Sequence, residues 1–295
     1  MNFAKQNFNQ PLIFSVFLLV LSIIFFINTS GNKSIDFSKV IDYNKIYFAG
    51  EKVPLDGNYE HNKQKFEREL IITVFNTYQF MLYHKREGIY FPYIEKKLKE
   101  NGIPDDFKYL AVAESALKND SVSSVGAGGI WQFMPETAKS YGLIVNEYVD
   151  ERYNFEKSTD AAILHIKSLY ADFKNRTLVA AAYNRGGNGI KRALDDQHVS
   201  RLYDLYLNEE TDKYIWRILA IKYVMENRYK LIENYNLGEK YQEPKYKIEK
   251  VGKIDNLKDW STQKGYIYAS IKELNPWIVK DSLPNGNREI KIPVY

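Results

Sequence analysis

The chain of 295 residues is long enough for one large domain, or for one medium domain with appended segments. Apolar residues make up 45% of it, enough for a full core, and a net charge of +4 is too mild to indicate nucleic-acid binding. The absence of cysteine excludes thiol catalysis, disulfides and thiolate metal sites. The four histidines show no metal-binding spacing, so we expect no metal and no cofactor. They are His61, His84, His165 and His198.

The N-terminus carries an uncharged apolar run at residues 11–27. Its length is at the short limit for spanning a bilayer and slightly long for the core of a signal peptide. We therefore expect residues 1–30 to be a signal peptide or a membrane anchor, without choosing between them. Either one exports the rest of the chain to the periplasm or cell envelope, and membrane contact is expected only through this segment.

Residues 31–60 are polar and irregular and predict a linker, whereas residues 61–235 show helical periodicity almost throughout. One apolar stripe comprises Phe66, Leu70, Ile71, Val74, Phe75, Tyr78, Met81 and Leu82. Further helices are predicted at 93–99, from Pro104, from Pro135 to about 142, at 160–173 with Ser158 or Thr159 as cap, at 177–183, and from Asn208 to about 231. The sequence thus predicts a mainly α-helical domain over residues 61–235.

Residues 236–295 have a different pattern. Residues 246–251 and 288–295 alternate as strands do, and residues 256–262 and 268–274 predict short helices between them. The tail is therefore expected to form a small β-α-α-β module.

Glu114 shares the apolar face of a predicted helix with Phe107, Leu110 and Leu117. A carboxylate on such a face must be paired or stay protonated, because burying a bare charge is costly. A neutral carboxylic acid near pH 7 is what glycoside cleavage uses to protonate the leaving oxygen. Taken alone, however, Glu114 would be interpreted as a partly exposed carboxylate at a helix end.

A glycine-rich loop follows this helix. Gly126 and Gly128-Gly129 allow the backbone to approach a ligand closely, and Gln132 offers an amide for sugar hydroxyls or N-acetyl groups. The alternative is that these glycines only build the loop. A later Ala-rich helix ends in Tyr183-Asn184, beside a second glycine-containing break.

Four motifs follow one another over about residues 95–230. They are Glu114-Ser115-x-Leu117, Ser123-x-x-Gly126-Ala127-x-Gly129-Ile130-Trp131-Gln132-Phe133-Met134-Pro135-x-Thr137-Ala138, Ala180-Ala181-Ala182-Tyr183-Asn184-x-Gly186 and Glu210-Thr211-x-x-Tyr214. Their types and order resemble the lytic transglycosylase (SLT) family, most closely its membrane-bound lytic murein transglycosylase D group. The tail, with Asn275-Pro276-Trp277, is similar to the LysM-like segment that often follows.

The resemblance implies a lysozyme-like helical catalytic domain that acts, as a monomer, on the glycan strands of peptidoglycan. It makes Glu114 the single catalytic acid/base, and it implies that Glu210 orients Tyr183 or a ligand. The implied saccharide-binding residues are Ser123, Gln132, Tyr183, Asn184, Glu210 and Tyr214. Two departures are Leu117, where the family commonly has an aromatic residue, and Arg185, which interrupts the usual Tyr-Asn-Ala-Gly pattern.

The implied reaction cleaves the bond between N-acetylmuramic acid and N-acetylglucosamine and closes a 1,6-anhydro ring. It agrees with the sequence in that no second carboxylate occupies a comparable glycine-loop context, as a two-carboxylate hydrolase would need. A lysozyme-type hydrolase and an inactive cell-wall-binding protein remain the alternatives. Whether the tail binds glycan or braces the domain is left open.

Overall fold

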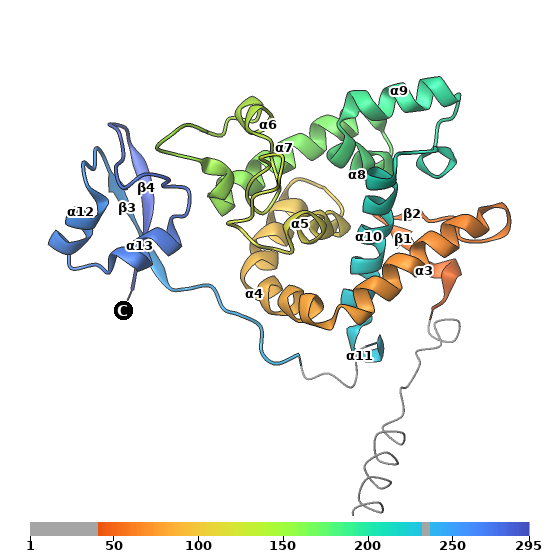
Figure 1. The fold of residues 1–295 in the computed structure, drawn as a ribbon, viewed down its shortest axis with the longest axis horizontal. Coiled ribbons are helices and arrows are strands. Elements are labelled where there is room, and N and C mark those ends of the chain that lie inside the picture. The colour runs from red at the N-terminus through yellow and green to blue at the C-terminus, as the bar shows by residue number, and fades with distance from the viewer. Residues whose placement is uncertain (1–40, 232–236, 295) are drawn as a thin grey trace, which may run out of the picture. The chain divides into compact units, whose positions relative to one another are not determined.

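The computed structural model describes residues 41–231 and 237–294 (Figure 1). The chain divides into two compact units, residues 1–41 and 42–295. The predicted signal peptide or anchor at residues 11–27 lies outside the described residues. Within the described ranges, no helix has the length and apolar character needed to cross a membrane.

The described part of the chain is mainly helical. Its helices and strands are β1 (Tyr47–Phe48), β2 (Glu51–Lys52), α3 (Glu60–Phe75), α4 (Thr77–Glu100), α5 (Lys108–Ser115), α6 (Pro135–Ser140), α7 (Phe155–Phe173), α8 (Arg176–Arg185), α9 (Gly187–Gln197), α10 (Glu209–Glu226), α11 (Arg228–Leu231), β3 (Tyr246–Val251), α12 (Leu257–Gln263), α13 (Tyr268–Leu274) and β4 (Arg288–Pro293). This architecture confirms the predicted fold class, a mainly α domain with a small C-terminal β-α-α-β module.

Helix α10 is the central element of the helical domain, packing against α3, α5 and α8 (Figure 1). It is apolar on most sides, and Ile218, Leu219 and Ala220 are buried. A helix that is apolar nearly all round is stable only when neighbours cover it on several sides. Because α10 touches α5, it brings the fourth motif, with Glu210 and Tyr214, beside Glu114.

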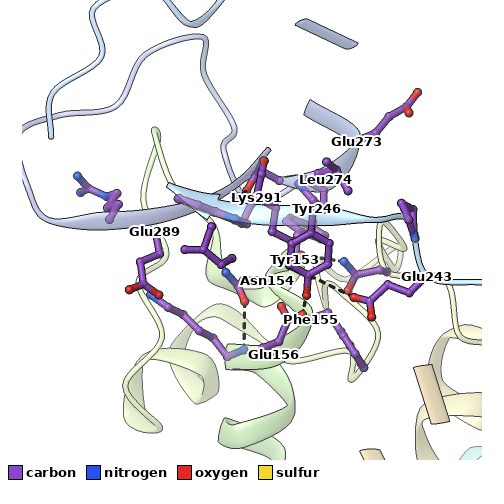
Figure 2. A pocket seen from close by; sticks show the side chains of 18 of the residues that line it. Tyr153, Asn154, Phe155, Glu156, Glu243, Tyr246, Glu273, Leu274, Glu289 and Lys291 are labelled. Atoms are coloured by element: carbon purple, nitrogen blue, oxygen red, sulfur yellow. Dashed lines mark hydrogen bonds and ion pairs between the residues drawn. The ribbon is translucent and has the colours of Figure 1, made fainter. Parts of the chain in front are cut away.

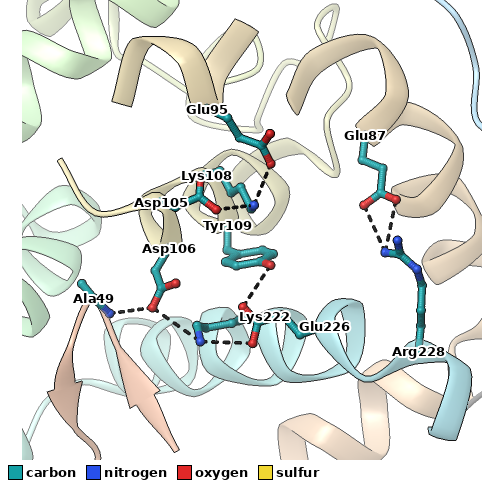
Figure 3. Close-up of polar contacts among 10 residues, drawn as sticks. All are labelled: Ala49, Glu87, Glu95, Asp105, Asp106, Lys108, Tyr109, Lys222, Glu226 and Arg228. Carbon is teal, nitrogen blue, oxygen red and sulfur yellow. Dashed lines mark hydrogen bonds and ion pairs between the residues drawn. The ribbon is translucent and has the colours of Figure 1, made fainter. Parts of the chain in front are cut away.

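A polar network links these elements (Figure 3). Asp106 accepts a hydrogen bond of 2.6 Å from the backbone N–H of Ala49 and lies 3.5 Å from the ammonium of Lys222. Lys222 also pairs with Glu226 at 3.2 Å, and the Tyr109 hydroxyl donates to Glu226 at 3.4 Å. The network fixes the start of α5 to α10 and to the β1–β2 hairpin.

That hairpin lies in the segment predicted as an irregular linker. Strands β1 and β2 pair in antiparallel fashion, and the side chains of Ile46, Phe48 and Val53 are buried. The ring of Phe48 meets that of Phe107 edge-on at 5.4 Å between centroids. Apolar and polar residues alternate there over too few positions for the sequence to distinguish these strands from a loop.

The stripe predicted over residues 66–82 is not one continuous buried face. The chain breaks at Asn76, whose side chain caps α4 by accepting from the N–H of Gln79. Phe75 and Tyr78, on either side of this break, are exposed, Tyr78 by 86%. The helix predicted at 93–99 is the end of α4, which continues through Pro92.

The cap predicted for α7 was wrong. Asn154 is the cap residue, and its side chain accepts from the N–H of Lys157 at 3.1 Å. Ser158 and Thr159 are fully buried inside the helix, where the Thr159 hydroxyl accepts a 3.0 Å hydrogen bond from the indole N–H of Trp131. Serine and threonine can serve either as a helix cap or as a buried residue within a helix. The tertiary contact with Trp131 is what shows that Thr159 has the second role.

In the tail, β3 and β4 pair in antiparallel fashion, with Tyr246 opposite Pro293 and Val251 opposite Arg288. The tail contacts the segment before α7 through backbone bonds: Asp150 N–H donates to Trp277 O at 2.9 Å, and a bridge joins Val149 to residue 278. Val149 is fully buried in the core of the tail. The segment before α7 therefore belongs structurally to both modules.

A cavity of about 560 Å³ lies between residues 153–157 and the tail strands (Figure 2). Lys291 reaches from β4 across it and pairs with Glu156 at the start of α7. None of the predicted site residues lines this cavity.

Candidate active site

Glu114 is the penultimate residue of α5. The helix ends because Ala116 and Leu117 both adopt left-handed backbone angles, with φ of 57° and 56°. The hydroxyl of buried Ser115 donates to the carbonyl of Ile130 at 2.9 Å. This bond ties the helix end that carries Glu114 to the glycine-rich loop.

The side chain of Glu114 is half-buried and accepts a 2.7 Å hydrogen bond from the hydroxyl of Tyr214 on α10. Burial raises the pKa of Glu114 to about 7, which outweighs the lowering effects of the Tyr214 hydrogen bond and the Arg217 charge, and the nearby Glu210 adds to the rise. Near neutral pH the group therefore exchanges readily between the protonated and ionised forms. That is the property a general acid/base requires.

The glycine-rich loop is held by close backbone packing. Gly129 has φ of +79°, and a Cβ on it would lie only 2.0 Å from the carbonyl oxygen of Arg152. Only glycine satisfies both the left-handed angle and this approach. The loop is further closed by mutual backbone hydrogen bonds between Gly128 and Phe133.

Arg152 clamps the loop from the side. Its guanidinium donates to the carbonyls of Gly126 at 2.7 Å and Phe133 at 3.0 Å, and also to both carboxylate oxygens of Asp150. Both charged side chains are buried. Since the N–H of Asp150 bonds to Trp277, this clamp connects the tail to the loop beside Glu114.

Aromatic rings form one wall of the site. The Tyr183 hydroxyl donates to the carbonyl of Trp131 at 2.9 Å, and its ring lies 5.1 Å from the imidazole of His165. His165 is hydrogen-bonded to the Tyr141 hydroxyl at 2.8 Å, and burial lowers its pKa to about 4. The imidazole is therefore neutral at physiological pH.

All seven predicted site residues line one cavity of about 740 Å³, which we call the aromatic arm. They are Glu114, Ser123, Gln132, Tyr183, Asn184, Glu210 and Tyr214. Two of them also serve the loop itself: Ser123 Oγ accepts from the N–H of Ala127, and the Gln132 amide donates to the carbonyl of Gly129.

A second cavity of about 570 Å³, the basic arm, adjoins Glu114. Ala113, Glu114, Lys213 and Arg217 line both arms. Residues unique to it include Arg68, Glu69 and Gln79. Glu114 thus stands where two hollows of the surface meet, as an acid acting within an extended ligand would.

The Tyr183 hydroxyl is hydrogen-bonded to the Trp131 carbonyl, and the expected role of Glu210 in orienting Tyr183 or a ligand stays a prediction. Two further carboxylates, Glu209 and Glu210, line the aromatic arm, but they belong to the first turn of α10 and not to a glycine-rich loop. Glu114 is distinguished from these two by its partial burial, since both of them are exposed.

The sequence reasoning did not identify Ser115, Arg152 or His165 as parts of the site. Ser115 follows Glu114 in a recognised motif, which was a usable signal. No local sequence pattern marks Arg152 or His165 as part of the site. Arg152 contacts residues 19 and 26 positions away in the chain, and His165 contacts a residue 18 positions away. Over residues 41–231 and 237–294, no three His, Asp or Glu side chains gather closely enough to hold a metal ion.

Two family models match the chain. The Transglycosylase SLT domain matches residues 91–204, and the Soluble lytic transglycosylase C-terminal LysM-like domain matches residues 246–294. The first match includes Glu114, the glycine-rich loop and Tyr183-Asn184.

Individual proteins resemble parts of the chain. Membrane-bound lytic murein transglycosylase D of Escherichia coli (strain K12) is 29% identical over 143 residues, covering 47% of this chain and 32% of that protein. The putative tributyltin chloride resistance protein of Alteromonas sp. (strain M-1) is 27% identical over 108 residues, covering 36% of this chain and 52% of that protein. The solved structure of the 70 kDa soluble lytic transglycosylase SLT70 of Escherichia coli aligns with a TM-score of 0.39 at 23% sequence identity. The alignment covers 48% of this chain and 25% of that chain.

The chain spans about one third to one half of the length of the curated relatives that it matches. The first match lies within the helical residues 61–235 and the second lies within the tail, in the predicted order. The chain thus carries a transglycosylase SLT domain followed by a LysM-like C-terminal domain.

Proposed function

We propose that this protein is a peptidoglycan lytic transglycosylase that cleaves the β-1,4 bond between N-acetylmuramic acid and N-acetylglucosamine. The observation that carries the proposal is the half-buried Glu114, with a pKa of about 7, at the meeting point of two cavities in an SLT domain. A lone exposed carboxylate would be ionised at neutral pH and could not donate a proton.

The proposed reaction has two proton transfers through Glu114. The protonated acid donates to the glycosidic oxygen, the bond from this oxygen to muramyl C1 breaks, and the N-acetylglucosamine leaves with a free hydroxyl. The resulting carboxylate accepts the proton of the muramyl C6 hydroxyl as O6 bonds to C1. The 1,6-anhydro ring is closed, no water is consumed, and Glu114 ends protonated as it began.

The hydrogen bond from Tyr214 suits both half-reactions. It stabilises the carboxylate that is formed when Glu114 gives up its proton, yet burial keeps the pKa high enough for protonation. The Tyr183 ring and the Gln132 and Asn184 amides supply stacking and hydrogen-bonding groups for sugar rings on the aromatic arm.

The competing hydrolase would use water and a second carboxylate. Glu210 is the candidate, because it lines the same cavity and its charge acts on Glu114. The lyase reaction needs no such group. Replacing each carboxylate separately therefore distinguishes the two mechanisms.

Mass spectrometry of digested peptidoglycan tests the proposal with the wild type, Glu114→Gln and Glu210→Gln. We expect anhydro-muropeptides from the wild type, no turnover by Glu114→Gln, and the same anhydro products, formed more slowly, from Glu210→Gln. Reducing muropeptides from the wild type, together with an inactive Glu210→Gln, would establish the hydrolase instead. A wild type that binds peptidoglycan without any product would establish the inactive wall-binding protein.

We further propose that the protein acts as a monomer in the cell envelope, exported by residues 1–30. The similarity to a protein named as membrane-bound, together with the apolar run at residues 11–27, supports this location. Fractionation of cells expressing the full chain, with and without residues 1–30, tests it: the location is wrong if both forms remain in the cytoplasm.

A further inference from the structure

The basic arm of the cleft has a different chemical character from the aromatic arm. Its charged lining comprises the cations Arg68, Lys213 and Arg217 and the acids Glu69 and Glu114. With Glu114 counted as ionised, three cations face two carboxylates, so the net charge of this lining is positive.

The two arginines are held in place by one buried carboxylate. Glu69 pairs with Arg68 at 2.9 Å through Oε1 and with Arg217 at 3.8 Å through Oε2. Glu69 is 4% exposed at its side chain, whereas the arginine side chains are 45% and 46% exposed. One buried acid therefore presents two guanidinium groups whose remaining N–H donors face solvent.

A further donor lies in the same cavity. The amide Nε2 of Gln79 is buried there and has no hydrogen-bond partner among the described residues. A buried amide without a partner loses free energy that a suitable ligand atom can restore. The N–H groups of the half-exposed arginines that Glu69 does not engage, together with this amide, can donate to an acceptor on a ligand.

The aromatic arm lacks this bias. Its charged lining is balanced between Glu114, Glu209 and Glu210 and the cations Arg185, Lys213 and Arg217, and Arg185 bonds to the amide oxygen of Asn208. Planar guanidinium groups favour carboxylates because two N–H donors match two oxygens.

We propose that the basic arm is a carboxylate-binding site that holds the acidic substituent of a glycan strand while the sugar rings occupy the aromatic arm. The proposal rests on the proposed function for the nature of the strand. In peptidoglycan the carboxylate has two sources: the stem peptide on the lactyl group, or the lactyl group itself once the peptide has been removed.

The test measures binding to the full chain in detergent, with Glu114→Gln as background so that nothing is consumed. Three ligands are compared by calorimetry: peptide-bearing strands, amidase-stripped strands with free lactyl carboxylates, and stripped strands whose carboxylates have been converted to methylamides. The test variant is Arg68→Gln, since Arg68 lines the basic arm and not the aromatic arm. Exposed Arg192→Gln on α9 is the matched control.

We expect Arg68→Gln to weaken binding of at least one carboxylate-bearing strand by roughly fivefold, with no change for the methylamide strand and none from Arg192→Gln. A loss confined to the peptide-bearing strand identifies the stem peptide as the source, and a loss confined to the stripped strand identifies the lactyl group. Equal weakening of all three strands, or of none, overturns the proposal.

These outcomes do not depend on the reaction products. If the enzyme released reducing ends, the proposed function would fail while the binding contrast between charged and neutral strands could still hold. Conversely, anhydro products with no binding contrast would remove only the carboxylate site.

Discussion

The hydroxyl of Tyr214 donates a 2.7 Å hydrogen bond to Oε1 of Glu114 across 100 positions of sequence. Glu114 belongs to α5 and Tyr214 to α10, two helices packed against each other in the domain core. The contact moderates the pKa of the acid, because a donor to the charged form partly offsets the larger effect of burial.

Replacing Tyr214 with Phe removes this donor and is expected to raise the pKa of Glu114 above its present value of about 7. In the proposed mechanism Glu114 acts as an acid when protonated, so the alkaline limb of the pH–rate profile should move to higher pH while the maximal rate falls. Profiles of kcat over pH 5 to 9 measure the shift. A limb that moves to lower pH would contradict this account of Glu114.

Glu114→Gln should stabilise the fold in a pH-dependent way. The folded-state pKa of Glu114 is raised from 4.5 to about 7, so its favourable contribution is fully present below pH 4.5 and is lost as the pH rises through 7. The variant should therefore gain free energy of unfolding relative to wild type at pH 8, by up to about 3 kcal/mol, and little at pH 4. Denaturant unfolding at both pH values checks this, and a gain independent of pH would refute it.

Gly129→Ala and Gly126→Ala form a matched pair in the glycine-rich loop. Both glycines have positive φ, but a Cβ on Gly129 meets the Arg152 carbonyl at 2.0 Å, whereas a Cβ on Gly126 meets nothing within 4 Å. We expect about 1–2 kcal/mol of destabilisation from backbone strain at Gly126 and at least ~2 kcal/mol more at Gly129. Thermal unfolding compares them, and equal losses would show that the close approach is unimportant.

A double-mutant cycle tests the Arg152–Asp150 clamp. Arg152→Met leaves buried Asp150 without its partner and should cost about 3–5 kcal/mol in free energy of unfolding. Adding Asp150→Asn removes the stranded charge, so the double variant should lose less than the sum of the single variants, by at least ~1 kcal/mol. Strictly additive losses would mean that the pair does not act as a unit.

Val149→Asp tests whether the tail braces the helical domain. Val149 is fully buried in the tail core, so a charge there should cost about 3–5 kcal/mol and, through Asp150 and Arg152, slow turnover of soluble glycan fragments. Exposed Ile144→Asp in the same segment is the control and should cost less than ~1 kcal/mol. If the two variants behave alike, the tail does not support the glycine-rich loop. Sedimentation of the protein with insoluble peptidoglycan then tests whether the tail binds glycan instead.

Much of the molecule was predictable from local sequence. Pro135 begins α6 as expected, and β3 and β4 occur where apolar and polar residues alternate. Predictions from local sequence failed where one residue pattern is compatible with two different structures. The cap of α7 and the break at Asn76 are examples, since Asn, Ser and Thr serve as caps or as buried residues with similar ease.

Periodicity and motif order are local properties of the chain, so the helical domain, the β-α-α-β tail and Glu114 as the candidate acid could all be predicted from the amino-acid sequence. The folded structure was needed to show that Tyr214 bonds to Glu114, that Arg152 holds the glycine-rich loop, and that Arg68 and Arg217 share Glu69 beside Glu114. These contacts join residues that are mostly distant in sequence, and the pKa of Glu114 is set by burial and by charges that only folding brings near it.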